Sequence, residues 1–101
     1  MDVRLPIAPD VLAELCRRHH IRKLSLFGSQ LKGTARPESD IDLLVEFEPD
    51  ALITYFDMAR IEIELSPLLG GRRVDLRTPQ ELSRYFRDEV VRMAEPQYVA
   101  G

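Results

Sequence analysis

The stretch Leu26–Phe47, LFGSQLKGTARPESDIDLLVEF, decides the fold because it predicts two strands joined by a connection that contains glycine and proline. Apolar side chains alternate along both expected strands, Lys23–Phe27 and Asp40–Phe47. Asp40 and Asp42 interrupt the second apolar run. Burying an unpaired carboxylate costs several kcal/mol or more, so this pattern requires a compensating group. A metal ion is the obvious candidate.

The residues before this stretch predict a helix that begins at Pro9, since proline suits the first helical position. Cys16 lies on the apolar face of that helix and is interpreted as a small buried core residue. His19 and His20 follow at the C-terminal end of the helix and are interpreted as a solvated or capping pair. Adjacent helical side chains point about 100° apart, so the two rings cannot easily share one metal ion.

The residues after the stretch predict an amphipathic helix over Leu52–Leu65, which Pro67 should end or kink. The buried side of this helix is expected to be the apolar stripe formed by Leu52, Phe56, Ala59 and Ile63. Gly70 and Gly71 then predict a turn into a third strand, Arg72–Arg77. On that strand Val74 and Leu76 share one face and Asp75 lies on the other.

The last part of the chain predicts one more helix, which a capping box at Thr78–Glu81 opens. The apolar face of this helix is expected to consist of Leu82, Phe86, Val90 and Met93. Pro96 should end the helix, and residues 95–101 are expected to form a loosely held C-terminal tail.

These elements predict an α/β (α+β) fold: a small mixed sheet with helices packed mainly on one face. The second and third strands are joined through a helix, so they can be parallel. With 101 residues, of which 45% are hydrophobic and 31% charged, the chain is expected to form a single domain over residues 1–101.

Charge and hydropathy exclude several classes of protein. The net charge of −3 argues against a protein that grips nucleic acid directly through its phosphates. No apolar stretch approaches the roughly 18 residues that a membrane span needs, and the N-terminus lacks the apolar core of a signal peptide. With a single cysteine the chain cannot form an internal disulfide, so a cytoplasmic location without membrane association is expected.

The aspartates predict the chemistry. Asp40 and Asp42 are two residues apart on a strand, so both side chains lie on one face, with Cα atoms roughly 6–7 Å apart. If the third strand is a neighbour, Asp75 joins them. Three carboxylates with room for water and phosphate are typical of a Mg²⁺ site. Two such ions, about 3.5–4 Å apart, would support an in-line displacement at phosphorus.

The connection between the first two strands predicts a phosphate site. Gly28 at the end of a strand lets the backbone approach a phosphate closely, and the Ser29 hydroxyl can donate a hydrogen bond to it. Lys32 and Arg36 could supply a counter-charge to the same phosphates.

Taken together, these motifs resemble the G-S-x10-D-x-D signature of the minimal nucleotidyltransferases, which belong to the DNA polymerase β-like superfamily. The signature falls on Gly28-Ser29 and Asp40-Ile41-Asp42, and the resemblance extends through Ser39–Phe47, Leu68–Leu76 and Thr78–Val90.

The resemblance implies a mixed sheet, Mg²⁺ and ATP as substrate. It implies Asp40, Asp42 and Asp75 as metal ligands, with Asp75 close to the acceptor hydroxyl and able to assist its deprotonation. Gly28 and Ser29 would hold the triphosphate. Relatives often carry arginine where this chain has Gln30 and Lys32, and lysine lacks the bidentate fork of arginine.

Stand-alone members of this family resemble the antitoxins of type VII toxin–antitoxin pairs, which are encoded beside a HEPN ribonuclease toxin. The resemblance implies transfer of AMP from ATP to a tyrosine of that helical partner, which silences the ribonuclease. Two alternatives stay open. The chain could mask the toxin by binding alone, or it could modify a small molecule such as an aminoglycoside.

Overall fold

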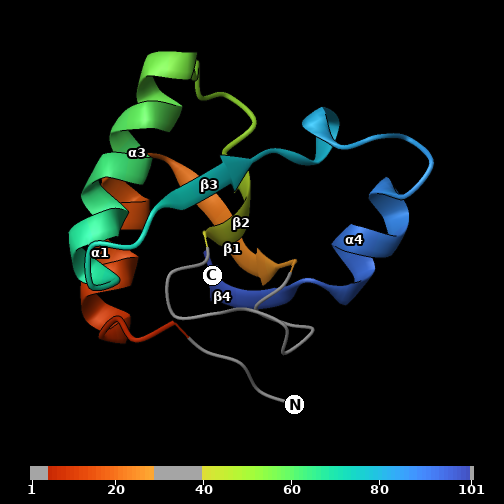
Figure 1. Ribbon diagram of the computed structural model, residues 1–101. Coiled ribbons are helices and arrows are strands. Elements are labelled where there is room, and N and C mark those ends of the chain that lie inside the picture. Colours follow the sequence, from red (N-terminus) through yellow and green to blue (C-terminus); the bar gives the residue numbers. More distant parts are fainter. Residues whose placement is uncertain (1–4, 29–39, 101) are drawn as a thin grey trace.

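Four strands form one mixed sheet in the computed structural model, which describes residues 5–28 and 40–100 (Figure 1). The elements in chain order are α1 (Pro9–Arg18), β1 (Ile21–Phe27), β2 (Ile41–Phe47), α3 (Tyr55–Leu68), β3 (Val74–Arg77), the 3₁₀ helix η1 (Pro79–Glu81), α4 (Arg87–Met93) and β4 (Glu95–Val99). The strand order is β3-β2-β1-β4. Strand β2 is parallel to β3, and β1 is antiparallel to both β2 and β4. The mixed sheet and the parallel pairing are confirmed.

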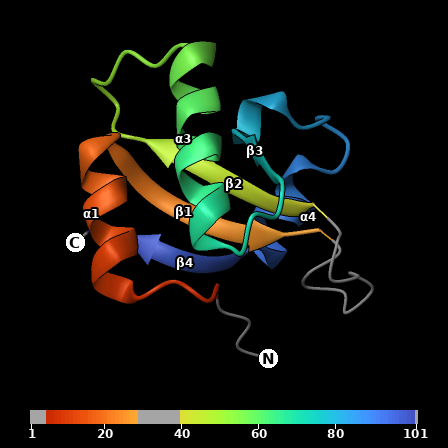
Figure 2. The same ribbon diagram turned by 60° about the vertical axis from the view of Figure 1, so that its left-hand side comes forward.

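Helices α1 and α3 lie side by side on one face of the sheet, whereas α4 lies on the other side (Figures 1 and 2). We call the helix-bearing side the covered face; its strand residues are Leu24, Leu26, Ile41, Leu43, Val45, Val74 and Leu76. They pack against Leu12, Leu15, Cys16, Ile61 and Leu65 of the two helices. The expectation that helices pack mainly on one face is therefore confirmed.

Alternation along the strands sets the opposite side, which we call the open face. Its residues are Ser25 on β1, Asp42 and Leu44 on β2, and Asp75 and Arg77 on β3. The predicted orientation of both strands in the opening stretch is confirmed, because Leu24, Leu26 and Leu43 are almost completely buried. Ser25 and Leu44 are buried as well, so part of the open face is shielded from solvent.

The prediction for α3 is wrong in its buried side. Its buried residues are Ile61 and Leu65, with Met58 packed beside them, whereas the predicted stripe points to solvent. The exposed fractions of the stripe's three large side chains are 95% for Leu52, 87% for Phe56 and 71% for Ile63. The helix carries apolar residues on two sides, and packing against the sheet selects the side that holds Ile61 and Leu65.

The bounds of α3 also differ from the prediction. The helix begins after Thr54, whose side chain and that of Asp57 form a capping box. It continues through Pro67 to Leu68, because a proline near the C-terminal end removes only one backbone hydrogen bond. Gly70 and Gly71 then make the expected turn with positive φ angles.

The last helix is shorter than predicted. The capping box of Thr78 and Glu81 is present, but it opens only the 3₁₀ helix η1, and α4 begins eight residues after η1 starts. The guanidinium group of Arg87 donates hydrogen bonds to the carbonyls of Pro79, Gln80 and Leu82. The side chain thus occupies acceptors that the N–H groups of a continuous helix would use. Of the predicted apolar face only Leu82 is buried.

The predicted C-terminal tail is wrong, because residues 95–99 form strand β4. Leu24 pairs with Tyr98 and Leu26 with Glu95, and the Tyr98 side chain packs on the core. The N–H of Ala100 also donates to the carbonyl of Arg22. Pro96 can occupy this strand because β4 lies at the edge of the sheet, where a missing N–H is tolerated.

Ionic contacts join α1 to α3. His19 caps the end of α1, and its Nε2 atom lies 2.6 Å from Glu64 Oε2, while Arg18 bonds the other oxygen at 3.0 Å. Burial opposes the ionisation of Glu64, but these hydrogen bonds outweigh it and the pKa of Glu64 lies below its ordinary value. His19 is thus a capping residue as predicted, but it is paired rather than solvated.

Cys16 has the predicted structural role, since it is fully buried and burial raises the pKa of its thiol to about 12. Within residues 5–28 and 40–100, the structure contains no helix that is both long and apolar enough to span a membrane.

Candidate active site on the open face

Asp42 and Asp75 lie directly opposite each other on the parallel strands β2 and β3. Both side chains point to the open face, because their neighbours Leu43 and Leu76 pack into the core on the other side. Two carboxylates of the same charge therefore share one small area of the sheet. The sequence predicted this pairing, and the register of β2 with β3 produces it.

Asp40 lies outside this tight pair. It precedes the first residue of β2, and it is exposed. Its charge nevertheless acts on Asp42. In the part of the chain that the structure describes, no three carboxylate, imidazole or thiol groups are gathered closely enough to hold a metal ion as they stand. The structure thus brings Asp42 and Asp75 together and leaves Asp40 at the margin of the open face.

The pKa of Asp42 lies above its ordinary value. Partial burial is the largest cause, and the negative charges of Asp75 and Asp40 add to it. Arg77 acts in the opposite direction. Because neighbouring carboxylates disfavour further negative charge, this part of the open face is short of positive charge. A bound cation would relieve that repulsion.

Arg77 is the nearest cation that the structure places in this area. It is two residues after Asp75 on β3, and its Nη2 atom lies 3.3 Å from Asp75 Oδ2. The side chain is 46% exposed, so solvent screens the ion pair and its contribution to stability is small. Arg77 was not among the residues predicted for the site, although alternation along β3 places it on the same face as Asp75.

Gly28 stands beside Asp42 because β1 ends opposite the start of β2, where Phe27 pairs with Asp42. Its φ angle is +80°, which side chains other than hydrogen rarely allow. A Cβ atom at this position would overlap Asp42 Oδ2 and lie 3.1 Å from its Cγ atom. Because glycine has no side chain, the Asp42 carboxylate can lie directly against the backbone at this position.

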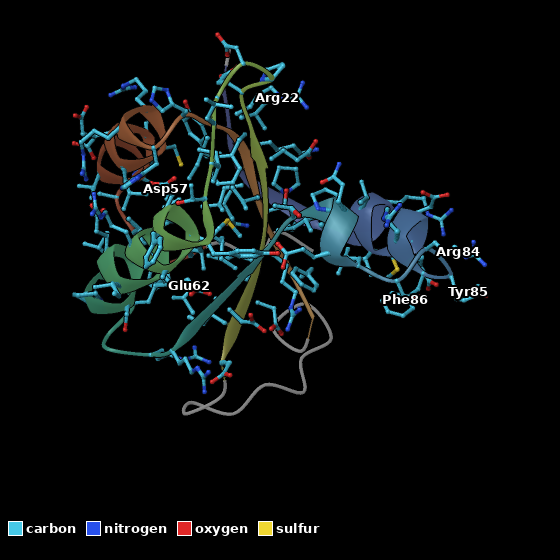
Figure 3. All side chains as sticks on the ribbon, turned by 90° about the horizontal axis from the view of Figure 1, so that it is seen from above. Arg22, Asp57, Glu62, Arg84, Tyr85 and Phe86 are labelled. Atoms are coloured by element: carbon cyan, nitrogen blue, oxygen red, sulfur yellow. The ribbon has the colours of Figure 1, made fainter. Side chains whose placement is uncertain are left out.

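Glu62 is a further residue near the site that was not predicted from the sequence. It lies on α3 beside β3 (Figure 3), and its carboxylate accepts the N–H of Leu76 at 2.8 Å. Strand β3 is at an edge of the sheet, so this N–H has no strand partner on that side. The bond fixes the backbone next to Asp75. No local sequence signal predicts it, because the contact depends on how α3 packs.

The predicted phosphate-binding residues Ser29, Lys32 and Arg36 lie outside the residues that the structure describes, as does Gln30. Only Gly28 of the predicted nucleotide site can be placed. The roles of Ser29, Lys32 and Arg36 remain predictions from the sequence.

The donor set fits a hard divalent cation. Asp42 and Asp75 offer carboxylate oxygens on adjacent strands, which are the ligands that Mg²⁺ prefers. Among the described residues, the charge of Arg77 offsets part of their repulsion.

Comparisons with known proteins agree with this geometry. The family described as nucleotidyltransferase domain matches residues 9–97. The protein adenylyltransferase MntA of Thermococcus cleftensis is 38% identical over 81 residues, which cover 78% of this chain and 77% of that protein. A Methanocaldococcus jannaschii protein, provisionally named a protein adenylyltransferase, is 33% identical over 94 residues and covers 92% of this chain and 91% of its own.

Solved structures show the same fold. One, provisionally described as a minimal nucleotidyltransferase, is 40% identical, covers 85% of each chain and has a TM-score of 0.68. A toxin–antitoxin structure with AMP-PNP is 22% identical, covers 93% of this chain and 75% of its own, and has a TM-score of 0.70. The Shewanella oneidensis MNT antitoxin with a tri-AMPylated HEPN toxin is 19% identical, covers 91% and 70%, and has a TM-score of 0.62.

The last two likenesses concern the fold alone, but the family match spans most of the chain, residues 9–97. The chain therefore belongs to the nucleotidyltransferase domain family.

Proposed function

We propose that this nucleotidyltransferase transfers AMP from ATP to a tyrosine hydroxyl of a HEPN-type ribonuclease toxin, and thereby acts as its antitoxin. The observation that carries the proposal is the cross-strand pair of Asp42 and Asp75, whose repulsion calls for a cation. The relative from Thermococcus cleftensis is named a protein adenylyltransferase, and a structural neighbour is an antitoxin bound to a tri-AMPylated HEPN toxin.

Asp40, Asp42 and Asp75 are the proposed ligands of Mg²⁺, with two ions in the complete site. Bound Mg²⁺ would neutralise charge on the phosphates and favour the attacking form of the acceptor oxygen. Asp40 lies at the margin of the open face, and its charge acts on Asp42. Gly28, Ser29, Lys32 and Arg36 are the proposed contacts of the triphosphate.

The proposed reaction is a single displacement at the α-phosphorus of ATP. The tyrosine oxygen forms a new bond to this phosphorus, and the bond to the bridging oxygen of pyrophosphate breaks. Asp75 accepts the tyrosine proton and passes it to solvent. Its place on the open face, next to Asp42 and accessible to solvent, suits this role. The products are the AMP-modified tyrosine and pyrophosphate.

The modification has a physical route to inhibition. AMP adds a bulky group and a negative charge to the toxin, and negative charge near an RNA-binding surface repels the phosphates of RNA. The net charge of −3 on this chain does not favour direct binding of RNA by the antitoxin itself.

The test uses ATP labelled at the α-phosphate, Mg²⁺ and a HEPN-type toxin from the same organism. We expect label on the toxin from α-labelled but not γ-labelled ATP, and none with Asp42→Asn. The matched control is Asp50→Asn, which changes an exposed aspartate in the turn after β2 and should transfer label normally. Absence of label with the wild-type chain would contradict the proposal.

One observation favours a second candidate, an antitoxin that inhibits by binding alone: the described residues offer no three acidic groups gathered for a metal ion. In that case the chain would form a stable complex that blocks RNA cleavage without ATP, and Asp42→Asn would inhibit as well as the wild type.

A further inference from the structure

The side of α3 that faces away from the sheet carries an apolar stripe with no partner among the described residues. We call it the outer stripe; it consists of Leu52, just before the helix, and Tyr55, Phe56, Ala59 and Ile63. Within the helix, positions 56, 59 and 63 follow the spacing of three and four residues that lets one helix pack along another. Leu52 lies in the segment that leads into the helix. The stripe is thus a regular feature rather than scattered apolar residues.

The size of the outer stripe is that of a protein interface. Its four large side chains are between 71% and 95% exposed. Side chains of this kind expose on the order of 600 Å² together, which reaches the upper end for the largest apolar patch of a typical monomer. One side of a standard interface buries about 800 Å². A partner helix that covers the stripe and its margins would bury an area of this order.

Charge indicates what kind of partner fits. Each acidic side chain of α3 is already used within the chain. Asp57 belongs to the capping box, Glu62 accepts the N–H of Leu76, and Glu64 bonds Arg18 and His19. Arg60, which lies at the edge of the outer stripe, is exposed. Its charge acts on Asp57, but no carboxylate in the described part of the chain lies within ion-pair distance of it.

A second copy of the chain fits this surface poorly. It would present the same acidic groups, all of them already bonded. In a symmetric pair of α3 helices that cross at Ala59, the two Arg60 side chains would also meet, and like charges destabilise such a contact. A different protein that supplies its own carboxylate would not have this difficulty.

We propose that the outer stripe is the docking site for an amphipathic helix of the protein partner, with an apolar ridge along Leu52, Phe56 and Ile63 and a carboxylate opposite Arg60. The identification of that partner as the HEPN-type toxin rests on the proposed function. The stripe faces away from the sheet, whereas Asp42 lies on the open face. The docked helix and the tyrosine that accepts AMP are therefore different segments.

The experiment compares two double substitutions of exposed apolar residues. Phe56→Glu/Ile63→Glu changes the outer stripe, and Tyr85→Glu/Met93→Glu changes exposed residues around α4, on the other side of the sheet (Figure 3). Both are made in the Asp42→Asn background, so that modification of the toxin cannot alter binding. Titration calorimetry with the HEPN-type toxin gives Kd, and light scattering gives the mass of each free chain.

We expect the outer-stripe variant to raise Kd at least 30-fold, roughly the effect of losing one interface hot spot, and the α4 variant to change it less than about threefold. Arg60→Glu should raise Kd about tenfold, and Arg60→Lys much less. Because the changed side chains are exposed, the melting temperatures should stay close to that of the parent chain.

Three results would overturn the inference: an unchanged Kd in the outer-stripe variant, a wild-type homodimer that this variant dissociates, or no binding of the toxin at all. Failure of the proposed function looks different. If the toxin binds through the outer stripe but never receives label from α-labelled ATP, the proposed docking site is supported and the proposed transferase activity is contradicted. If Phe56→Glu/Ile63→Glu is placed in the chain that keeps Asp42 and transfers label as well as the wild type, the transferase activity stands and the docking surface does not.

Discussion

The two faces of the sheet are made by the same strands, yet they differ in nearly every property. On the covered face Leu24, Leu43 and Val45 are fully buried under α1 and α3. On the open face Asp42 and Asp75 stand side by side, and the pKa of Asp42 is raised by partial burial and by the like charges. Consecutive residues such as Asp42 and Leu43 therefore lie in different environments, Asp42 in the proposed site and Leu43 in the packed core.

This separation has a general reason. A strand turns each successive side chain to the opposite face, so a packed core on one side holds the other side in fixed register. The covered face can then supply the stability that a cluster of repelling carboxylates removes. The comparison predicts that substitutions on the open face change activity, and that substitutions on the covered face change stability.

The largest expected effect is on the open face. Asp42→Asn should lower AMP transfer by about 10³-fold, which corresponds to the several kcal/mol that metal-assisted charge stabilisation supplies. In the absence of Mg²⁺ the same variant should melt at the same temperature or a higher one, since it removes the repulsion with Asp75. A clear fall in melting temperature would show that Asp42 supports the fold, and would contradict the division of roles between the open and the covered face.

The neighbouring residue should behave in the opposite way. Leu43 is completely buried among the core residues of the covered face, so Leu43→Ala should lower the free energy of unfolding by about 2–5 kcal/mol. Urea denaturation measures this directly. Ile63→Ala, on the outer stripe of α3, is the control and should change the free energy by less than about 0.5 kcal/mol. Similar losses in both variants would mean that the outer stripe is buried in solution.

Gly28 lies against Asp42 at the end of β1, and its substitution should lower stability less than Leu43→Ala does. Gly28→Ala places a side chain at a φ angle of +80°, which costs about 1–2 kcal/mol. The added Cβ atom also displaces the Asp42 carboxylate, so we expect transfer to fall more than stability does. Denaturation and labelling of one preparation test both effects. An alanine variant with full activity would exclude Gly28 as a determinant of the site.

The smallest effect concerns pH. The pKa of Asp42 is raised in the folded chain, so the folded state holds this proton more tightly than the unfolded state does. The contribution of Asp42 to stability should therefore fall as pH rises from the ordinary value of 3.8 through the raised pKa, and stay low above it. Without Mg²⁺, the stability of Asp42→Asn minus that of the wild type should increase across this window. A difference that is constant or decreases with pH would contradict the assignment.

The sequence predicted the central strands and the aspartate pair well, because alternation is a local signal. Lys23–Phe27 and Asp40–Phe47 contain it in full, and a buried face on one side leaves only one orientation for Asp42. The place of Asp75 followed from the same rule once β2 and β3 were parallel neighbours. These predictions needed no knowledge of distant contacts.

Most of the errors concern contacts that alternation and helical spacing do not contain; the start of α3 is an exception, because its capping box of Thr54 and Asp57 is a local signal. In α3 two sets of apolar residues have helical spacing, and only the packing against α1 and β3 shows that Ile61 and Leu65 are inside. The predicted length of the last helix was wrong because the Arg87 side chain donates hydrogen bonds to carbonyls up to eight residues earlier in the chain. The role of Glu62 was not predicted because its hydrogen-bond partner is a backbone N–H on another element. No pattern within a short window contains this information.

Strand β4 has a consequence for how the molecule is made. Strand β1 lies in the interior of the sheet, yet one of its two neighbours comes from the opposite end of the described chain. Contacts between such distant segments form late and slow folding down. During synthesis on the ribosome, β1 must therefore wait with one edge unpaired until β4 has emerged. A nascent chain halted before Glu95 should accordingly remain open to proteases at this edge.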